Sequence, residues 1–435
     1  MILLSLVFCL ACPAHGQQSM TLSECIRAAI DRNLDVKGQD LRVSKGTLAI
    51  TQARARLLPQ IGVTAAFNDN VADPVTVTGG TLLGKDFPDD MTWQKIRSTQ
   101  YQSSSAIEAA LPLIDLTRRA AIDVAKETAT LAKVGCEQAI ETLTVQLARV
   151  YYLAQTTKEQ QRLTDENIHR MSELCDIAEA LYQKGVALEI DASRVHIHLK
   201  NLQVVRQRYQ TLFAQQLNML RYLMNVDEAT ALDVVPVQTA VQDVGSLAVD
   251  TLLPELRLNA QQQTVLARQQ RRVRMGYLPK LSVVGSAGYT MFAEKFNHSH
   301  WFGNAIVGLR LTVPLFDANE KKHALRQLRL DSDNLRIARE QTLNRLRREC
   351  DDDRLQMEQN RTAYLTQKDN YRLAQEVYAV TREKYKEGVA SMAEVLQDEM
   401  SLRNAYTACL DALYQYKCAR LALLRLTGHL DELND

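Results

Sequence analysis

The chain carries the same series of short motifs twice, and this duplication constrains its fold more than any other feature. Three motifs recur in the same order: Leu58-Pro59 as Leu278-Pro279, Pro112-Leu113-Ile114-Asp115 as Pro314-Leu315-Phe316-Asp317, and Tyr182-Gln183-Lys184-Gly185 as Tyr385-Lys386-Glu387-Gly388. Solenoid repeats have units of about 20–50 residues, so this much longer spacing indicates a duplicated half-molecule. We therefore expect two structural repeats, residues 17–224 and 251–435, joined by a connector over residues 225–250.

Composition and motifs exclude several classes of function. The formal net charge is +1 over 435 residues, whereas a dedicated nucleic-acid binder usually carries a basic excess on one face. The sequence contains no nucleophile elbow, P-loop or HExxH motif. Outside the first residues it has no CxxC pair, and no Cys/His run has zinc spacing. We therefore expect no enzymatic activity, no nucleic-acid partner, no cofactor and no metal.

The first residues predict export. An apolar run over residues 2–11 has the length of a signal-peptide core, and Ala14 and Gly16 are the small residues that a signal peptidase reads. This predicts a signal peptide over residues 1–16. An alternative makes Cys12 the lipid-modified first residue of the exported chain. Beyond this leader no run reaches the roughly 18 apolar residues that a membrane helix needs, so the exported chain is periplasmic, secreted or an outer-membrane β-barrel.

Long proline-free segments predict long helices. The longest run over residues 116–183 and 318–386, and the first of them carries a seven-residue stripe at Ile122, Ala129, Cys136, Leu143 and Val150. Such a stripe predicts helices wound around one another. At about 1.5 Å per residue each helix is on the order of 100 Å long. Returning helices are predicted over residues 189–224 and 391–427, and further helices over 21–55 and 254–275.

Four runs of about ten residues alternate between apolar and polar or small side chains. Their apolar positions are Ile61, Val63, Ala65 and Phe67; Ile107, Ala109, Leu111 and Leu113; Leu281, Val283, Gly285, Ala287 and Tyr289; and Ala305, Val307, Leu309, Leu311 and Val313. This is the length and alternation of a tilted membrane-spanning strand. Glu108 and Arg310 fall on the opposite face, which predicts that they line a lumen. Loops are predicted over residues 69–103 and 292–303, with His298 and His300 at a solvated tip.

Four strands are too few to close a barrel of useful width. A bilayer does not tolerate open sheet edges, because the unpaired backbone groups find no water there. Spanning strands therefore require several chains to share one barrel, although the strands do not fix the number of chains.

In its order of elements, its Leu-Pro strand entries, its Pro-Leu-(Ile/Phe)-Asp strand exits and its Tyr-x-x-Gly turns, the chain resembles the TolC family of outer-membrane efflux and secretion channels. The resemblance implies a mainly α-helical homotrimer with a small transmembrane β part. Each protomer would give four strands to a twelve-stranded barrel, continued by an α-helical periplasmic tunnel with an equatorial domain.

The resemblance also implies a function and partners. The trimer would be a passive exit duct of a tripartite efflux pump or a type I secretion system, located in the outer membrane with a long periplasmic extension. Its partners would be outer-membrane lipid, a periplasmic adaptor (membrane fusion) protein and, through the adaptor, an inner-membrane transporter of the RND or ABC type. The alternative is a periplasmic coiled-coil scaffold without a pore.

The two Tyr-x-x-Gly turns are the candidate functional region. By resemblance they form the periplasmic tip where an adaptor docks, through residues Gly185, Val186, Ala187, Leu188, Gly388, Val389, Ala390 and Ser391. The tunnel constriction would involve Asp191, Tyr385, Glu394, Gln397 and Asp398. Tyr385 would donate a hydrogen bond to Asp191, and Ala390 replaces an arginine of the family's best-known member. A simpler interpretation makes the turns ordinary hairpin turns and the acids ordinary surface charges near helix N-termini.

Overall fold

A computed structural model describes residues 18–72, 99–185, 188–228, 230–239, 248–295 and 298–434. The expected signal peptide lies outside these residues. The chain divides into two compact units, and each is assembled from both halves of the sequence. Unit 1 comprises residues 1–43, 132–260 and 337–435, and unit 2 comprises residues 44–131 and 261–336.

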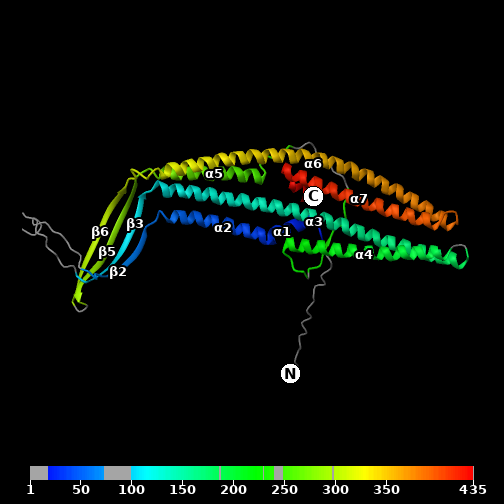
Figure 1. The fold of residues 1–435 in the computed structure, drawn as a ribbon, viewed down its shortest axis with the longest axis horizontal. Coiled ribbons are helices and arrows are strands. Elements are labelled where there is room, and N and C mark those ends of the chain that lie inside the picture. Colours follow the sequence, from blue (N-terminus) through cyan, green and yellow to red (C-terminus); the bar gives the residue numbers. More distant parts are fainter. Residues whose placement is uncertain are drawn as a thin grey trace, which may run out of the picture. The chain divides into compact units, whose positions relative to one another are not determined.

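Unit 2 contains a four-stranded antiparallel sheet (Figure 1). Its strands, in the order β2-β3-β5-β6, are β2 (Gln60–Asp69), β3 (Tyr101–Ile114), β5 (Lys280–Lys295) and β6 (His298–Thr312). The predicted loop over residues 292–303 is wrong, because β5 and β6 pair through most of it and Phe292 lies opposite His300. His298 and His300 are therefore strand residues. Polar and aromatic side chains interrupt the apolar alternation here, so the sequence pattern did not show that the two strands continue. The Phe292 and Phe302 rings lie 6.1 Å apart across the β5–β6 pair.

The register of the sheet separates its two faces as the alternation predicted. Val63, Ile107, Ala287 and Ala305 form one cross-strand row, which places the four predicted apolar faces on one side. On the opposite face Glu108 pairs with Ser286 and Arg310 pairs with Ser282. The Thr64 hydroxyl donates to the Glu108 carboxylate at 3.4 Å. Glu108 and Arg310 therefore share the polar face of the sheet.

Small side chains let the helices of unit 2 approach one another closely. Gly46 of α2 (Leu34–Ala55) packs so tightly on Ala129 of α3 (Leu116–Gln183) that a Cβ at position 46 would lie 3.0 Å from the Ala129 Cα. Arg268 of α5 (Pro254–Met275) forms an ion pair with Glu127 of α3 at 3.2 Å. The close approach is what the heptad stripe of small residues predicted.

In unit 1 the predicted first helix is interrupted. α1 (Leu22–Arg32) ends at Asn33, whose extended backbone (φ −58°, ψ 134°) separates it from α2. The Asn33 side-chain carbonyl accepts from the backbone N–H groups of Asp35 and Val36, and its amide donates to the Leu223 carbonyl at 2.8 Å. Asn33 therefore caps α2, and this cap stabilises the helix that begins after the break.

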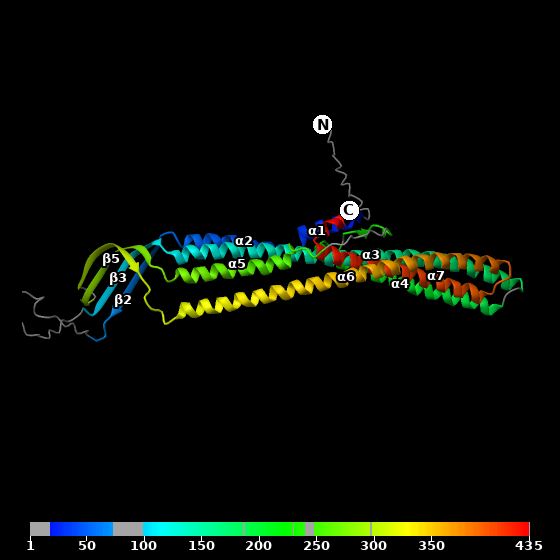
Figure 2. The ribbon, with the colours of Figure 1, turned by 90° about the horizontal axis from the view of Figure 1, so that it is seen from above.

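The rest of unit 1 consists of two helical hairpins and a short parallel strand pair. α3 pairs with α4 (Glu189–Met224), and α6 (Glu320–Lys386) pairs with α7 (Met392–Thr427), as Figures 1 and 2 show. β1 (Gln18–Met20) pairs with β4 (Leu232–Val234), and a 3₁₀ helix, η2 (Leu430–Asn434), ends the described chain. The strand pair was not predicted, because three residues are too few to show a period. Among the described residues, no helix combines the length and apolar character that crossing a membrane requires.

Candidate gating and docking site

Both hairpin turns of unit 1 are built around a left-handed glycine. Gly185 and Gly388 have φ of +71° and +77°, a conformation that costs other residues about 1–2 kcal/mol. Their N–H groups donate to the carbonyls of Tyr182 and Tyr385, respectively, at 2.9 and 3.0 Å. The space around each missing Cβ is open, so the backbone conformation alone requires glycine here.

The two turns differ in how the next helix begins. Ser391 caps α7 in a complete capping box, since its hydroxyl accepts from the Glu394 N–H while the Glu394 carboxylate accepts from the Ser391 N–H. Leu188 precedes α4 without a side-chain cap. The expected docking residues Val186 and Ala187 lie outside the described residues. In this chain, therefore, the Glu394 carboxylate has a structural task at a helix N-terminus.

A pocket beside the second turn brings together part of the predicted site. Its walls include Asp191, Tyr385, Gly388, Ala390 and Ser391. Glu394, Gln397 and Asp398 follow along α7 and do not line this pocket; Gln397 is exposed and Asp398 is half-buried. Leu188 and Val389 are exposed apolar residues at the turns.

The expected hydrogen bond between Tyr385 and Asp191 is absent. The Tyr385 hydroxyl is buried and has no hydrogen-bond partner among the described residues. The Asp191 carboxylate instead pairs with Arg194, one turn along α4, at 3.3 Å. Burial, with a smaller contribution from the negative Asp191, raises the pKa of Tyr385. The sequence placed the two residues together correctly but did not reveal Arg194 as the competing partner.

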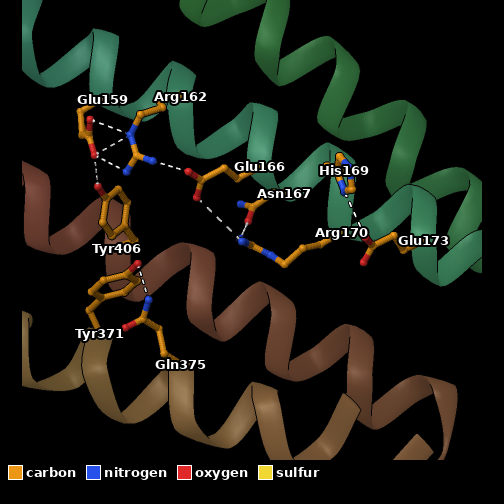
Figure 3. Close-up of polar contacts among 10 residues, drawn as sticks. All are labelled: Glu159, Arg162, Glu166, Asn167, His169, Arg170, Glu173, Tyr371, Gln375 and Tyr406. Atoms are coloured by element: carbon orange, nitrogen blue, oxygen red, sulfur yellow. Dashed lines mark hydrogen bonds and ion pairs between the residues drawn. The ribbon is translucent and has the colours of Figure 1, made fainter. Parts of the chain in front are cut away.

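A polar network further along α3, α6 and α7 connects the two hairpins (Figure 3). The Tyr406 hydroxyl of α7 donates to Glu159 of α3 at 2.6 Å, and Arg162 binds both oxygens of the same carboxylate. The Tyr406 ring packs against Tyr371 of α6 with centroids 4.5 Å apart. Arg162 and Tyr406 lower the pKa of Glu159 by hydrogen bonding to its charged form. No local sequence pattern indicates this contact.

A buried carboxylate on α7 was also not predicted from the sequence. Glu399 is only 2% exposed, and its Oε1 atom has no hydrogen-bond partner among the described residues. Burial raises its pKa, although the nearby positive charges of Arg403, Arg170 and His198 partly oppose that rise. No three His, Cys, Asp or Glu side chains among the described residues are grouped to hold a metal ion.

Comparison with known proteins identifies the family. A sequence model described as "Outer membrane efflux protein" matches residues 25–226 and 238–429. The chain is 22% identical over 273 residues to the probable efflux pump outer membrane protein TtgC of Pseudomonas putida. That match covers 61% of this chain and 56% of TtgC, so the chain spans little more than half the length of this relative.

Solved structures share the fold. The outer membrane protein VceC of Vibrio cholerae has a TM-score of 0.72 and 15% identity, with 94% of this chain and 96% of VceC covered. The outer membrane channel CmeC of Campylobacter jejuni has the same TM-score and 16% identity, over 94% of this chain and 85% of CmeC. The predicted fold class and the predicted location in the outer membrane are thereby confirmed. The chain belongs to the outer membrane efflux protein family, the TolC-like channels that its duplicated motifs resembled.

Proposed function

We propose that the chain is one protomer of a passive, trimeric outer-membrane exit duct. It would carry substrates from an inner-membrane transporter, of the RND or ABC type, through a periplasmic adaptor to the cell exterior, in efflux or in type I secretion. Energy would come from the transporter, so the duct itself performs no catalytic step. Family membership supports this proposal, and the relative TtgC carries the name of an efflux pump component.

The open sheet of unit 2 is the observation that carries the proposal. Edge strands β2 and β6 have no further partner strand among the described residues. Their apolar side chains are largely exposed, with Val63 at 75% and Val307 at 83%. Unpaired edges and an exposed apolar face are unfavourable in water, but both are satisfied when β2 of one copy pairs with β6 of the next and the apolar face meets lipid. Three copies would give the twelve strands of the family.

Exposed heptad stripes on the helices support the same assembly. Leu34, Leu41 and Leu48 of α2 are exposed at seven-residue spacing, and so are Ile190, Ile197 and Val204 of α4. Such stripes are buried when another helix packs along them. The helices thus need neighbouring copies for the same reason as the sheet. Glu108 and Arg310, on the polar face, would then line the barrel lumen.

The turn region would serve as the gate and the docking tip. Glu394, Asp398 and Gln397 of three copies would surround the narrow end of the tunnel, where a ring of carboxylates attracts cations. Asp191 and Tyr385 would pack the wall behind them. Gly185, Val186, Ala187, Leu188 and their counterparts Gly388, Val389, Ala390 and Ser391 would contact the adaptor.

The assembly is tested by negative-stain electron microscopy of detergent-extracted protein. We expect hollow cylinders with three-fold end views and single-channel conductance in planar bilayers. A thin particle that extracts without detergent and never conducts would instead support the scaffold alternative.

The gate is tested by a pair of variants at Glu394. Glu394→Gln keeps the capping box but removes the charge, whereas Glu394→Ala removes both. We expect both variants to weaken block of the channel by divalent cations equally. An effect confined to Glu394→Ala would assign Glu394 to the helix cap and remove it from the gate.

A further inference from the structure

A pocket in unit 1, away from the hairpin turns, collects two cationic side chains. Its walls come from five segments of the chain: the start of α1, the middle of α3, the segment after β4, the end of α7 and η2. Tyr152 projects from α3, and Lys417 and Arg420 project from α7. The N-terminus of α1 on this wall is already capped, because the Thr21 hydroxyl accepts from the Glu24 N–H and the Glu24 carboxylate accepts from the Thr21 N–H.

The Lys417 ammonium has no carboxylate partner among the described residues. It lies 5.1 Å from the centroid of the Tyr152 ring, which gives it one cation–π contact. Burial, together with repulsion from Arg420, lowers the pKa of Lys417 to about 8. The side chain therefore remains largely protonated at neutral pH, as a half-buried charge that has no counterion in the described part of the chain.

Arg420 is also poorly paired. Its side chain is 16% exposed, and its Nε atom is buried without a hydrogen-bond partner in the described structure. The nearest carboxylate, Glu432, lies 3.8 Å away and is half exposed. Lys158 of the same unit is, by contrast, fully paired. Its Nζ atom lies 2.8 Å from both Asp233 carboxylate oxygens and 2.7 Å from the Val234 carbonyl oxygen.

Buried charges in proteins are normally paired, because an unpaired one loses its hydration without compensation. Among the described residues that line the pocket, two cations face one loosely placed acid, so this lining carries an excess of positive charge. We propose that the pocket binds a small oxyanion, with Lys417 and Arg420 as its two cationic ligands. Because five segments of a single chain line the space, we take its occupant to be a small free anion and not an acidic side chain of a neighbouring copy.

Isothermal titration calorimetry tests the proposal. The full chain in detergent is titrated with inorganic phosphate, and with chloride at matched ionic strength as the reference. This measurement does not depend on channel function. We expect saturable binding of one phosphate per chain. Lys417→Met keeps an unbranched stem on the Tyr152 ring while removing the charge, and should weaken binding by about tenfold or more. Lys322→Met, at an exposed lysine of α6, is the matched control and should bind like the wild type.

Thermal unfolding without phosphate gives a second readout. Because Lys417 is desolvated and repelled by Arg420, Lys417→Met should unfold at the same temperature as the wild type or higher. The proposal is wrong if phosphate gives no saturable heat, or if Lys417→Met binds it as well as the wild type. It is equally wrong if Lys417→Met breaks up the oligomer while phosphate has no effect, since the pocket would then hold an acid of a neighbouring copy.

Discussion

The two hairpin turns of unit 1 share a left-handed glycine but differ in what surrounds them. Three residues before each glycine, Tyr182 is 44% exposed whereas Tyr385 is 6% exposed. Three residues after each glycine, Leu188 gives α4 no cap whereas Ser391 caps α7. The two turns therefore have the same backbone conformation at the glycine but differ in burial and in capping.

The difference continues along the helices that follow. α4 and α7 have 36 residues each, but six residues of α4 are buried against sixteen of α7. Eleven residues after each glycine, His196 is exposed on α4 and Glu399 is buried on α7. α4 thus keeps a face available for other chains, whereas α7 is enclosed by its own chain.

Glu399→Met should produce the largest effect, because it removes a buried carboxylate with an unpaired oxygen. We expect stabilisation by about 2 kcal/mol at pH 7, since an unpaired buried group loses its full hydration. Thermal unfolding in detergent, followed by circular dichroism, measures this. The counterpart His196→Met, at an exposed position, should change stability by less than about 0.5 kcal/mol. Equal effects at both positions would contradict the contrast between α4 and α7.

The same variant predicts a pH dependence. Burial raises the pKa of Glu399 above its ordinary value of 4.5, against the opposing charges of Arg403, Arg170 and His198. The folded state therefore holds the proton more tightly than the unfolded state, and stability falls as the pH rises from 4.5 through the raised pKa. Tyr378, which Glu399 also faces, stays neutral over this range because its own pKa is raised. The advantage of Glu399→Met should consequently grow as the pH rises through this window, and below pH 4.5 it should be smallest and independent of pH.

Gly185→Ala and Gly388→Ala should come next, each costing about 1–2 kcal/mol. Neither new methyl group meets a neighbour within 4 Å, so the cost arises from the left-handed backbone alone and should be equal in the two turns. Gly38→Ala, at an exposed helical position that is equally open, should instead stabilise the protein by about 0.5–1 kcal/mol. A larger loss at Gly388 than at Gly185 would mean that the capping of α7 depends on the turn.

Ser391→Ala should cost about 1 kcal/mol, because α7 loses its cap and Glu394 loses half of the capping box. Leu188→Ala removes no cap from α4 and should cost much less. Helix content near the melting midpoint, compared between the two variants, tests the contrast in capping. Similar losses would show that the two helix starts are equivalent despite their different hydrogen bonds.

Local sequence patterns predicted the bounds of the long helices well. The expected bounds of α3, α4 and α5 agree with the structure, because prolines, glycines and heptads mark them within a few residues. The break at Asn33 was missed because it depends partly on the carbonyl of Leu223, which is distant in sequence. Glu399 and the Glu159–Tyr406 contact were missed for the same reason. Burial and pairing arise from tertiary contacts, which no short window of sequence contains.

Tyr385→Phe should have the smallest effect on stability, and it tests directly whether the Tyr385 hydroxyl helps to close the channel. If Tyr385 closed the tip by donating to Asp191, its loss would destabilise the turn and raise the conductance of the channel. The hydroxyl has no partner among the described residues, however, and Asp191 is paired with Arg194. We therefore expect the variant to be about 0.5 kcal/mol more stable, with unchanged conductance, because an unsatisfied buried hydroxyl is removed. Tyr182→Phe, at the exposed counterpart, should change neither quantity. If conductance rises in Tyr385→Phe but not in Tyr182→Phe, that result would show that the Tyr385–Asp191 hydrogen bond forms in the assembled, closed channel.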